Sequence, residues 1–404
     1  MATNDPKPFT SMEVFMAFLK LGLTSFGGPT AHIGFFQREF VESRKWLPQN
    51  HYADLVALSQ FLPGPSSSQL GMSIGYSRAG LGGAAAAWAG FTLPSALAMI
   101  LFGLCMDIIA RNHWDLTGLH GLKVAAVAIV AKALTDMAPR LCPDPARIAT
   151  AVLGMGIVLM MPSISGQITA IALGGVLGLL MKSQDSKEDS IKTDRPLVRK
   201  GSGKKFSLIC LASIPMLLIF LPVFSEWTSN QATSMFDSFF RTGSLVFGGG
   251  HVVLPLLQAE LVPRDWVENE VFLTGYGAAQ AVPGPMFTFA AFLGSVMKHT
   301  PNGWTGGILC LLAIFLPSFL FIIGAMPYWE TLRERAVIRS ALKGINASVV
   351  GLIAAAWISP VGTNGILSMM DLAIAATAFA LMAFKKTPSW VVVLFCAGFG
   401  WMSQ

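Results

Sequence analysis

The run Phe26-Gly27-Gly28-Pro29 lies inside an apolar stretch, and it returns as Phe247-Gly248-Gly249-Gly250 about 220 residues later. A second landmark behaves in the same way, because Pro63-Gly64-Pro65 returns as Pro283-Gly284-Pro285. Single residues also correspond, and they pair Lys20 with Arg241, Gln37 with Gln258, Glu39 with Glu260, Trp46 with Trp266 and Gln60 with Gln280. A duplicated apolar unit with Gly/Pro breaks at corresponding places is typical of secondary transporters whose site lies between the halves.

The composition is that of a membrane protein. Of the 404 residues, 53% are apolar and only 12% are charged, with a mean hydropathy of +0.60. Soluble domains carry about 25% charged residues. Apolar runs of roughly 17–25 residues, long enough to cross a bilayer as helices, recur along the chain. Transmembrane barrels would show alternation over ten-residue blocks instead. The predicted fold class is therefore an all-α polytopic membrane protein.

The net charge of +6 does not indicate nucleic-acid binding. Much of it falls in one hydrophilic stretch, residues 182–205, and the excess of Lys and Arg in cytoplasmic loops explains it more simply. The five cysteines are scattered, without a Cys-x-x-Cys pair, and are expected to be small apolar fillers. We predict no cofactor and no metal site.

Three parts are predicted along the chain. Residues 1–181 form an N-terminal transporter repeat, and residues 231–404 form the C-terminal one. Between them, residues 182–230 contain a basic, cytoplasmic linker and one additional apolar helix, 206–224, that has no counterpart in the first repeat. Because each repeat holds an even number of apolar segments, this single additional crossing predicts that the two repeats have inverted topology.

The charges of two corresponding loops support inversion. The loop after the first break contains Arg38, Arg44 and Lys45, whereas its counterpart holds Arg264 among acidic residues. Cytoplasmic loops carry an excess of Lys and Arg, so the basic loop and its acidic counterpart are expected on opposite sides of the membrane. The number of crossings stays open between thirteen full crossings and nine crossings with four re-entrant hairpins. The positions of the positive charges favour the re-entrant arrangement of the broken helices.

The breaks are predicted to bind an anion. Consecutive glycines permit unusual dihedral angles and close approach of a ligand, and Pro-Gly-Pro ends the preceding helix. A helix that restarts at Pro65 or Pro285 would point free N–H groups, with about half a positive charge, toward the break. A packing kink is the alternative for any single break, but four corresponding breaks favour a site. The substrate-binding candidates at the breaks are Gly27, Gly28, Pro29, Pro63, Gly64, Pro65, Ser66, Ser67, Gly248, Gly249, Gly250, Pro283, Gly284 and Pro285.

The two copies are not chemically equal. Residues 66–68 are three serines, whereas residues 286–288 are Met-Phe-Thr, so we expect the first copy to make the tighter oxyanion contacts.

Lys20 and Arg241 each lie six residues before Phe-Gly-Gly. Charges inside membrane segments face the interior or a cavity, so they are expected to supply countercharge to the anion, with snorkelling to the interface as the alternative.

Four further residues are considered near the breaks. His32 and His251 are substrate-binding candidates, because a histidine can donate a hydrogen bond to an anion or titrate near neutrality; simple helix packing is the alternative. Glu39 and Glu260 are the proton-coupling candidates, since a carboxylate can exchange a proton in each cycle, and the alternative is a solvated or ion-paired loop.

Catalysis is not predicted. The sequence contains no nucleophile elbow, no His-Glu-x-x-His and no phosphate loop. We therefore predict no catalytic residue and no enzyme activity. Since an ATPase would need the phosphate loop, any coupling is to an ion gradient.

These residues together resemble the chromate ion transporter (CHR) family. The first copy carries the run from Lys20 to His32, then Gln-Arg-Glu39, Trp46 and Gln60-Phe-Leu-Pro-Gly-Pro65; the second carries Phe247 to His251, Gln258-Ala-Glu260, Trp266 and Gln280-Ala-Val-Pro-Gly-Pro285. The resemblance covers nearly the whole chain outside the linker and the additional helix, and it fits the two-domain form. It implies a multi-pass protein of the bacterial inner membrane that exports chromate, driven by the proton-motive force.

The expected function is therefore secondary active export of chromate, an antiport that confers chromate resistance. A transporter of sulfate or another oxyanion, or a passive anion channel, is the alternative. The expected partners are chromate or sulfate, protons and membrane lipid. The oligomeric state, a homodimer included, is left open, as are the direction and stoichiometry of transport.

Overall fold

The structure is a computed structural model that describes residues 10–111, 119–181, 204–247 and 249–402. Every regular element in these ranges is a helix, which confirms the all-α prediction. Among the described residues, four helices are long and apolar enough to cross a membrane, namely Ser66–Met106, Lys204–Thr228, Gly303–Tyr328 and Ala336–Gly365. Residues 182–203 of the predicted linker lie outside the described residues, and its last two residues, Lys204 and Lys205, begin α8.

The first repeat and the additional helix run from α1 to α8. The elements are α1 (Ser11–Thr24), α2 (Gly28–Gln37), the π-helical η1 (Arg38–Ser43), α3 (Gln49–Phe61), α4 (Ser66–Arg111), α5 (His120–Leu141), α6 (Pro145–Met160), α7 (Ile164–Leu180) and α8 (Lys204–Thr228). The long α4 is kinked at Ala79 and Gly80, whose dihedral angles are not helical. It is therefore two helices that meet at a turn.

The second repeat begins at α9. Its elements are α9 (Gln231–Leu245), η3 (Gly250–Val252), α10 (Val253–Leu261), α11 (Asn269–Ala279), η4 (Met286–Thr288), α12 (Phe289–Ser295), α13 (Gly303–Ala325), η5 (Met326–Tyr328), α14 (Trp329–Glu334), α15 (Ala336–Ala356), η6 (Trp357–Gly362), α16 (Thr363–Gly365), α17 (Met369–Phe384) and α18 (Ser389–Met402). Helix starts coincide with capping side chains, because Asp144, Ser163, Asn230 and Ser368 each accept a hydrogen bond from a first-turn N–H.

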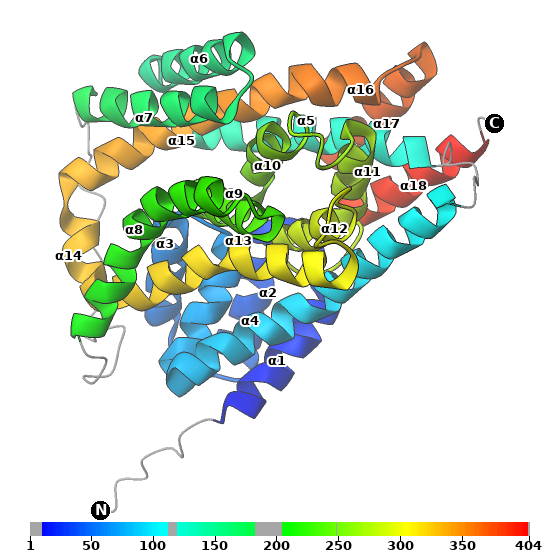
Figure 1. Cartoon of the computed structure of the whole chain (residues 1–404). Coiled ribbons are helices and arrows are strands. Elements are labelled where there is room, and N and C mark those ends of the chain that lie inside the picture. Colours follow the sequence, from blue (N-terminus) through cyan, green and yellow to red (C-terminus); the bar gives the residue numbers. More distant parts are fainter. Residues whose placement is uncertain (1–9, 112–118, 182–203, 248, 403–404) are drawn as a thin grey trace, which may run out of the picture.

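The two repeats are interleaved. α5 of the first repeat packs against α17 and α18 of the second. α15 is the counterpart of α5, and it packs against α6 and α7 of the first repeat. Figure 1 shows α5 and α15 across the upper part of the molecule, with α10 and α11 between them and the layer that contains α9, α12 and α13. Each repeat thus completes the packing of the other.

Corresponding glycines let helices approach closely within each repeat. A Cβ on Gly22 of α1 would lie 2.6 Å from the Gly90 carbonyl oxygen of α4, and a Cβ on Gly243 of α9 would lie 2.2 Å from the Ile314 carbonyl oxygen of α13. Gly22 and Gly243 occupy the same place relative to Phe-Gly-Gly. Small residues at such contacts are characteristic of membrane helix packing, and here the duplication extends to the packing.

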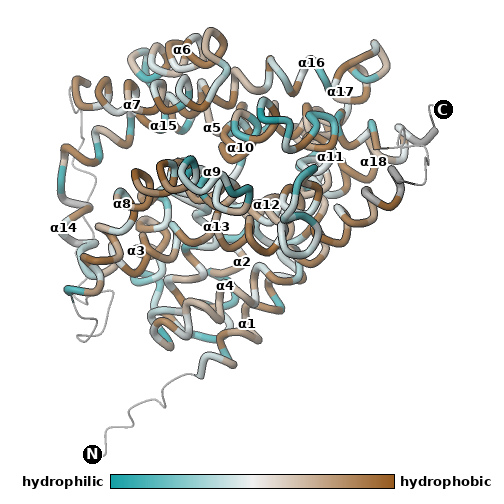
Figure 2. The backbone as a smooth tube through the Cα atoms, viewed as in Figure 1, coloured by the Kyte–Doolittle hydropathy of each residue, from teal (hydrophilic) through white to brown (hydrophobic). Residues whose placement is uncertain are grey.

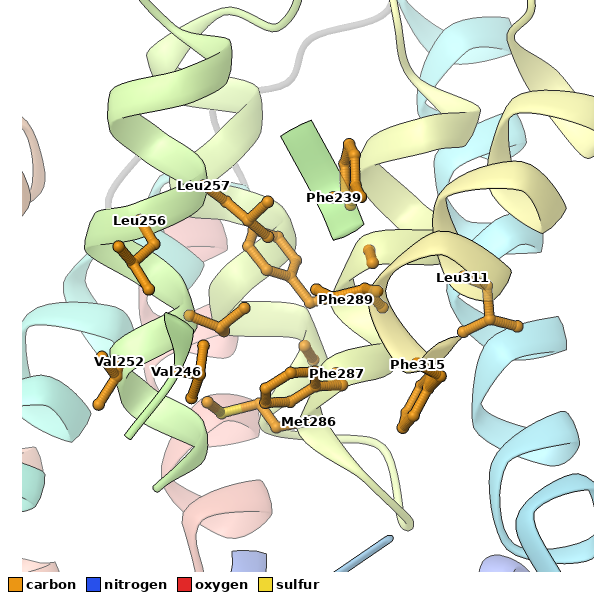
Figure 3. Packing of buried hydrophobic residues seen from close by; sticks show 14 of the residues in the cluster. Phe239, Val246, Val252, Leu256, Leu257, Met286, Phe287, Phe289, Leu311 and Phe315 are labelled. Atoms are coloured by element: carbon orange, nitrogen blue, oxygen red, sulfur yellow. The ribbon is translucent and has the colours of Figure 1, made fainter. Parts of the chain in front are cut away.

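The apolar residues form both the core and much of the surface. The core around the second-repeat breaks brings together Val246, Met286, Phe287 and, from α13, Phe315 (Figure 3). α8 exposes large apolar side chains, among them Ile209, Ile219 and Phe220, as expected for a helix in contact with lipid. Figure 2 shows hydrophobic residues along most helices and hydrophilic ones at connections such as that between α10 and α11.

Candidate substrate site

All four predicted breaks interrupt helices. The chain is non-helical at residues 25–27 between α1 and α2, and again at residues 246, 247 and 249 between α9 and η3. It is also non-helical at residues 62–65, before α4, and at residues 280–285, before η4. A regular α-helix restarts at Ser66, one residue after the predicted Pro65, whereas the second copy restarts with a three-residue 3-10 turn at Met286. Gly248 lies outside the described residues.

The backbone of each Pro-Gly-Pro break is hydrogen-bonded to the Phe-Gly-Gly break of the other repeat. The Gly64 N–H donates to the Val246 carbonyl at 2.7 Å, and the Gly284 N–H donates to the Ser25 carbonyl at 2.9 Å. Ser25 and Val246 correspond, since each directly precedes Phe-Gly-Gly. The same contact is therefore made twice in opposite directions, as a two-fold relation between the repeats would produce.

The same glycines contact a serine of the other repeat. A Cβ on Gly64 would lie 2.8 Å from Ser318 Oγ, and a Cβ on Gly284 would lie 2.9 Å from Ser95 Oγ. Ser95 and Ser318 correspond as the last residues of Leu93–Ser95 and Leu316–Ser318. Gly64 and Gly284 have φ values of 124° and 97°, a region that side chains disfavour. Both the dihedral angle and the close approach therefore require glycine.

Gly64→Ala is expected to lower the thermal unfolding midpoint of the protein in detergent. The added Cβ would meet Ser318 Oγ and the Gln69 amide, and the positive φ alone costs about 1–3 kcal/mol. Gly80→Ala is the matched control, because Gly80 has a φ of 62° and open space around its Cβ position. Equal shifts for the two variants would show that the contact with Ser318 contributes nothing.

The Phe-Gly-Gly breaks also meet. A Cβ on Gly250 would lie 3.9 Å from Pro29 Cγ and 3.3 Å from Met286 Cε. Pro29 and Gly250 occupy corresponding positions, so the proline ring of one repeat faces a glycine of the other. Gly27 and Gly28 have positive φ, as does Gly249. The breaks of both repeats are therefore brought to one place in the fold.

The two candidate histidines differ in their surroundings. His32 is fully buried and its Nε2 lies 3.2 Å from the Ser25 carbonyl, which also accepts the Gly284 N–H. Its Nδ1 has no hydrogen-bond partner among the described residues. His251 Nδ1 lies 2.8 Å from the Tyr276 hydroxyl. His32 thus supports a break directly, whereas His251 is held by α11.

Lys20 and Glu39 form an ion pair in the first repeat. Lys20 Nζ lies 3.4 Å from Glu39 Oε2, and Arg44 Nε lies 2.8 Å from Glu39 Oε1. Glu39 lies in η1, which follows α2 directly, and burial would raise its pKa. Arg44 and Lys20 outweigh that effect through hydrogen bonds and charge and hold the pKa of this carboxyl below its usual range. Glu39 is therefore ionised here.

The second repeat contains the same ion pairs and one more carboxylate. Arg241 Nη1 lies 3.4 Å from Glu260 Oε1, and Arg264 Nη2 lies 3.1 Å from Glu260 Oε2. Asp237 is hydrogen-bonded to Arg241 one turn away, and the Ser238 hydroxyl donates to Glu260 at 3.1 Å. We call Asp237, Arg241, Glu260 and Arg264 the second cluster, and Lys20, Glu39 and Arg44 the first cluster.

The two clusters differ most in exposure. The side chain of Glu260 is 1% exposed and that of Arg241 is 16%, whereas the side chain of Lys20 is 62% exposed. Arg44 and Arg264, which correspond, stack over Trp46 and Trp266 at 5.4 and 5.0 Å. Sequence reasoning missed Asp237, and it used Arg44 and Arg264 only as loop charges, without pairing them with Glu39 and Glu260. The signals were the i,i+4 spacing of Asp237 and Arg241 and the equal spacing of each arginine from its tryptophan.

The described helices, with their paired breaks and paired ion clusters, define a helical membrane protein built from two copies of one unit. The family model for chromate transporters matches residues 12–179 and 233–401, once in each half. The chain belongs to the chromate transporter family.

Individual relatives agree with the family model. The chromate transport protein of Pseudomonas aeruginosa is 28% identical over 98% of this chain and 93% of its own length. The chromate transport protein of Cupriavidus metallidurans is 24% identical over 95% of this chain and 91% of its own. An uncharacterized transporter of Bacillus subtilis is 35% identical over 39% of this chain and 90% of its own length, so it has the size of one repeat. No solved structure matches the chain.

Proposed function

We propose that this protein is a secondary carrier that exports chromate across the bacterial inner membrane, driven by the proton gradient. Family membership and the relatives named chromate transport proteins support chromate as the substrate. The oxyanion binds between the repeats, at the breaks. The observation that carries this proposal is the pair of reciprocal hydrogen bonds, Gly64 to Val246 and Gly284 to Ser25, which join the breaks of the two repeats.

The repeats are proposed to be inverted, with α8 as the odd crossing and the broken elements re-entrant. Non-helical backbone at membrane depth is tolerated only where it is buried in protein or lines a cavity. In support, Ser25, Val246, Gly250 and the whole of Pro63–Pro65 are buried. A broken segment that faced lipid would leave these backbone groups exposed to hydrocarbon.

Transport is proposed to occur by alternating access, because the two repeats have different surroundings. α11 packs on α5, and α10 packs on α15 and α7. Gly277 of α11 is buried, whereas its counterpart in α3, Ala57, is exposed. In carriers with inverted repeats, exchange of the two repeat conformations moves the opening from one side of the membrane to the other. The structure then represents one of two such states.

The second cluster is proposed as the proton-coupling site. It pairs Asp237 and Glu260 with Arg241, and Glu260 also with Arg264, so Arg241 keeps an acidic partner whichever of the two carboxylates takes up a proton. In the first cluster, protonation of Glu39 would leave both cations without that partner. α9 carries Arg241 and ends next to Val246, whose carbonyl accepts the hydrogen bond from the Gly64 N–H. A rearrangement of the second cluster would therefore occur about one helical turn from that hydrogen bond.

The proposal is tested by uptake of labelled chromate into proteoliposomes with the pH gradient set in each direction. An antiporter moves chromate against its gradient only when protons flow the opposite way. Competition by unlabelled sulfate measures substrate preference, and stronger competition by sulfate than by chromate would make the protein a sulfate carrier. Chromate flux that does not respond to the pH gradient would make it a passive channel.

Arg241→Ala is expected to abolish chromate transport in everted vesicles, and Lys20→Ala is expected to reduce it only about twofold. Removing Arg241 strips Glu260 and Asp237 of a buried partner, which costs about 3–5 kcal/mol, and removes the countercharge proposed for the second repeat. The ion pair of the exposed Lys20 with Glu39 contributes only about 0–1 kcal/mol to stability. Arg241→Lys, which imitates the first repeat, is the folding control. Unchanged transport by Arg241→Ala would remove its countercharge role.

A further inference from the structure

Two hydroxyl groups near each Pro-Gly-Pro break occupy corresponding positions in the repeats. One follows the second proline by three residues, at Ser68 and Thr288, and the other ends Leu-Pro-Ser, at Ser95 and Ser318. All four side chains are buried, with exposed fractions between 0 and 2%. A buried hydroxyl normally has a hydrogen-bond partner, so the partners of these four can be compared directly.

The break of the second repeat satisfies its own hydroxyls. Thr288 Oγ1 donates to the Pro285 carbonyl at 2.9 Å. Ser95, which faces Gly284, donates to the Thr92 carbonyl at 3.0 Å. Both groups are therefore used locally, and neither has a free proton to offer a ligand.

The break of the first repeat leaves the same two hydroxyls unsatisfied. Ser68 Oγ and Ser318 Oγ have no hydrogen-bond partner among the described residues. Ser318 reaches this break from α13 of the other repeat, where it faces Gly64. Unsatisfied buried groups in a native fold call for an explanation, of which a missing ion or ligand is one.

Backbone donors lie beside these hydroxyls. Ser66, Ser67 and Ser68 form the first turn of the first helix of α4, and their N–H groups have no acceptor within the helix. The next N–H, of Gln69, donates to the Pro65 carbonyl at 2.9 Å, and the Gln69 side-chain amide donates to the Pro63 carbonyl at 2.6 Å. The Pro63 and Pro65 carbonyls are thereby engaged, and the positive end of the helix favours an anion.

We propose that a tetrahedral oxyanion is bound at the first-repeat break by the hydroxyls of Ser68 and Ser318 and the amides of Ser66–Ser68. The inference rests on the proposed function and deepens it, because it places the binding contacts on one break and makes Ser318 of the second repeat part of them. The Ser68 and Ser318 hydroxyls and the backbone amides can donate to an anion, and Gln69 Oε1 is a buried oxygen acceptor beside them that has no hydrogen-bond partner among the described residues. The site is complete only when α13 of the second repeat lies against the first-repeat break.

The test is equilibrium binding of labelled chromate to the purified full-length protein in detergent. Ser318→Ala and Ser68→Ala are each expected to weaken binding about tenfold or more, since a hydrogen bond to a charged group is lost. Ser95→Ala and Thr288→Ala, at the corresponding positions, are expected to stay within about twofold of the parent protein. The four variants carry the same kind of substitution at equally buried sites, so they control for one another.

The unfolding midpoint without chromate is the second readout. Removing an unsatisfied buried hydroxyl is neutral or stabilising, so Ser318→Ala is expected to leave the midpoint unchanged or raised while chromate binding falls. The inference is overturned if all four variants bind chromate with equal affinity, which is the result expected if a water molecule occupies this break. It is also overturned if Ser95→Ala and Thr288→Ala lose as much chromate affinity as Ser68→Ala and Ser318→Ala. Transport by the parent in proteoliposomes is measured separately, and its absence would count against the proposed function alone.

Discussion

Glu260→Gln is expected to abolish the response of chromate transport to an imposed pH gradient. Flux in proteoliposomes should fall to the level measured with equal pH on both sides, and it should no longer rise when the gradient is applied. Glu260 is the most buried carboxylate of the second cluster and contacts both Arg241 and Arg264. Glutamine keeps the size and one carbonyl oxygen but cannot exchange a proton, so the substitution separates proton coupling from packing.

Three variants control this prediction. Glu260→Asp retains a titrating carboxylate and should retain a response to the gradient. Glu39→Gln removes the corresponding carboxylate of the first cluster, which its two basic partners hold ionised, and should leave the response intact. Asp237→Asn tests whether the two acids act together, because coupled carboxylates share their protons. A full pH response in Glu260→Gln, together with its loss in Glu39→Gln, would place the coupling in the first cluster.

The local parts of the site were predictable because Gly and Pro act on their own backbone. The described residues of the four breaks are non-helical where the sequence predicts a break, and the helix predicted to restart at Pro65 begins at Ser66. Apolar composition was sufficient for the all-α class. These features depend on residues within a few positions of each other, so the sequence alone carries the information.

The contacts between distant segments were not predictable in the same way. Lys20 and Arg241 were predicted to supply countercharge to the anion, and this role stays a prediction; their ion-pair partners in the structure, Glu39 and Glu260, were not predicted as such. That pairing depends on how α1 folds against α2 and η1, and how α9 folds against α10. Likewise the interleaving of α5 with α17 and α18 is a matter of tertiary packing. Correspondence between the copies indicated which residues to compare, but it did not give their ion-pair partners.

Fixing α11 to α5 with a chemical cross-link is expected to stop transport completely. Lys123 Nζ of α5 lies 3.4 Å from Glu270 Oε1 of α11, so cysteines at 123 and 270 should be joined readily by a short bismaleimide. The background is a protein whose five native cysteines are replaced by alanine or serine. Its transport is measured first, and each single-cysteine variant treated with the reagent is the control for modification alone.

The positions that correspond to 123 and 270 in the other repeat provide a test for the second conformation of the carrier. Lys343 corresponds to Lys123, and Asn50 corresponds to Glu270. Ala57 of α3 is exposed here while its counterpart Gly277 is buried against α5. If the repeats exchange conformations, α3 must come to lie on α15 as α11 now lies on α5. Cysteines at 50 and 343 should therefore cross-link only while chromate and a pH gradient are both present, and that cross-link should also stop transport. Transport at the parent rate with 123 joined to 270 would mean that α11 stays on α5 throughout the cycle, and the opening would then have to come from the first repeat alone.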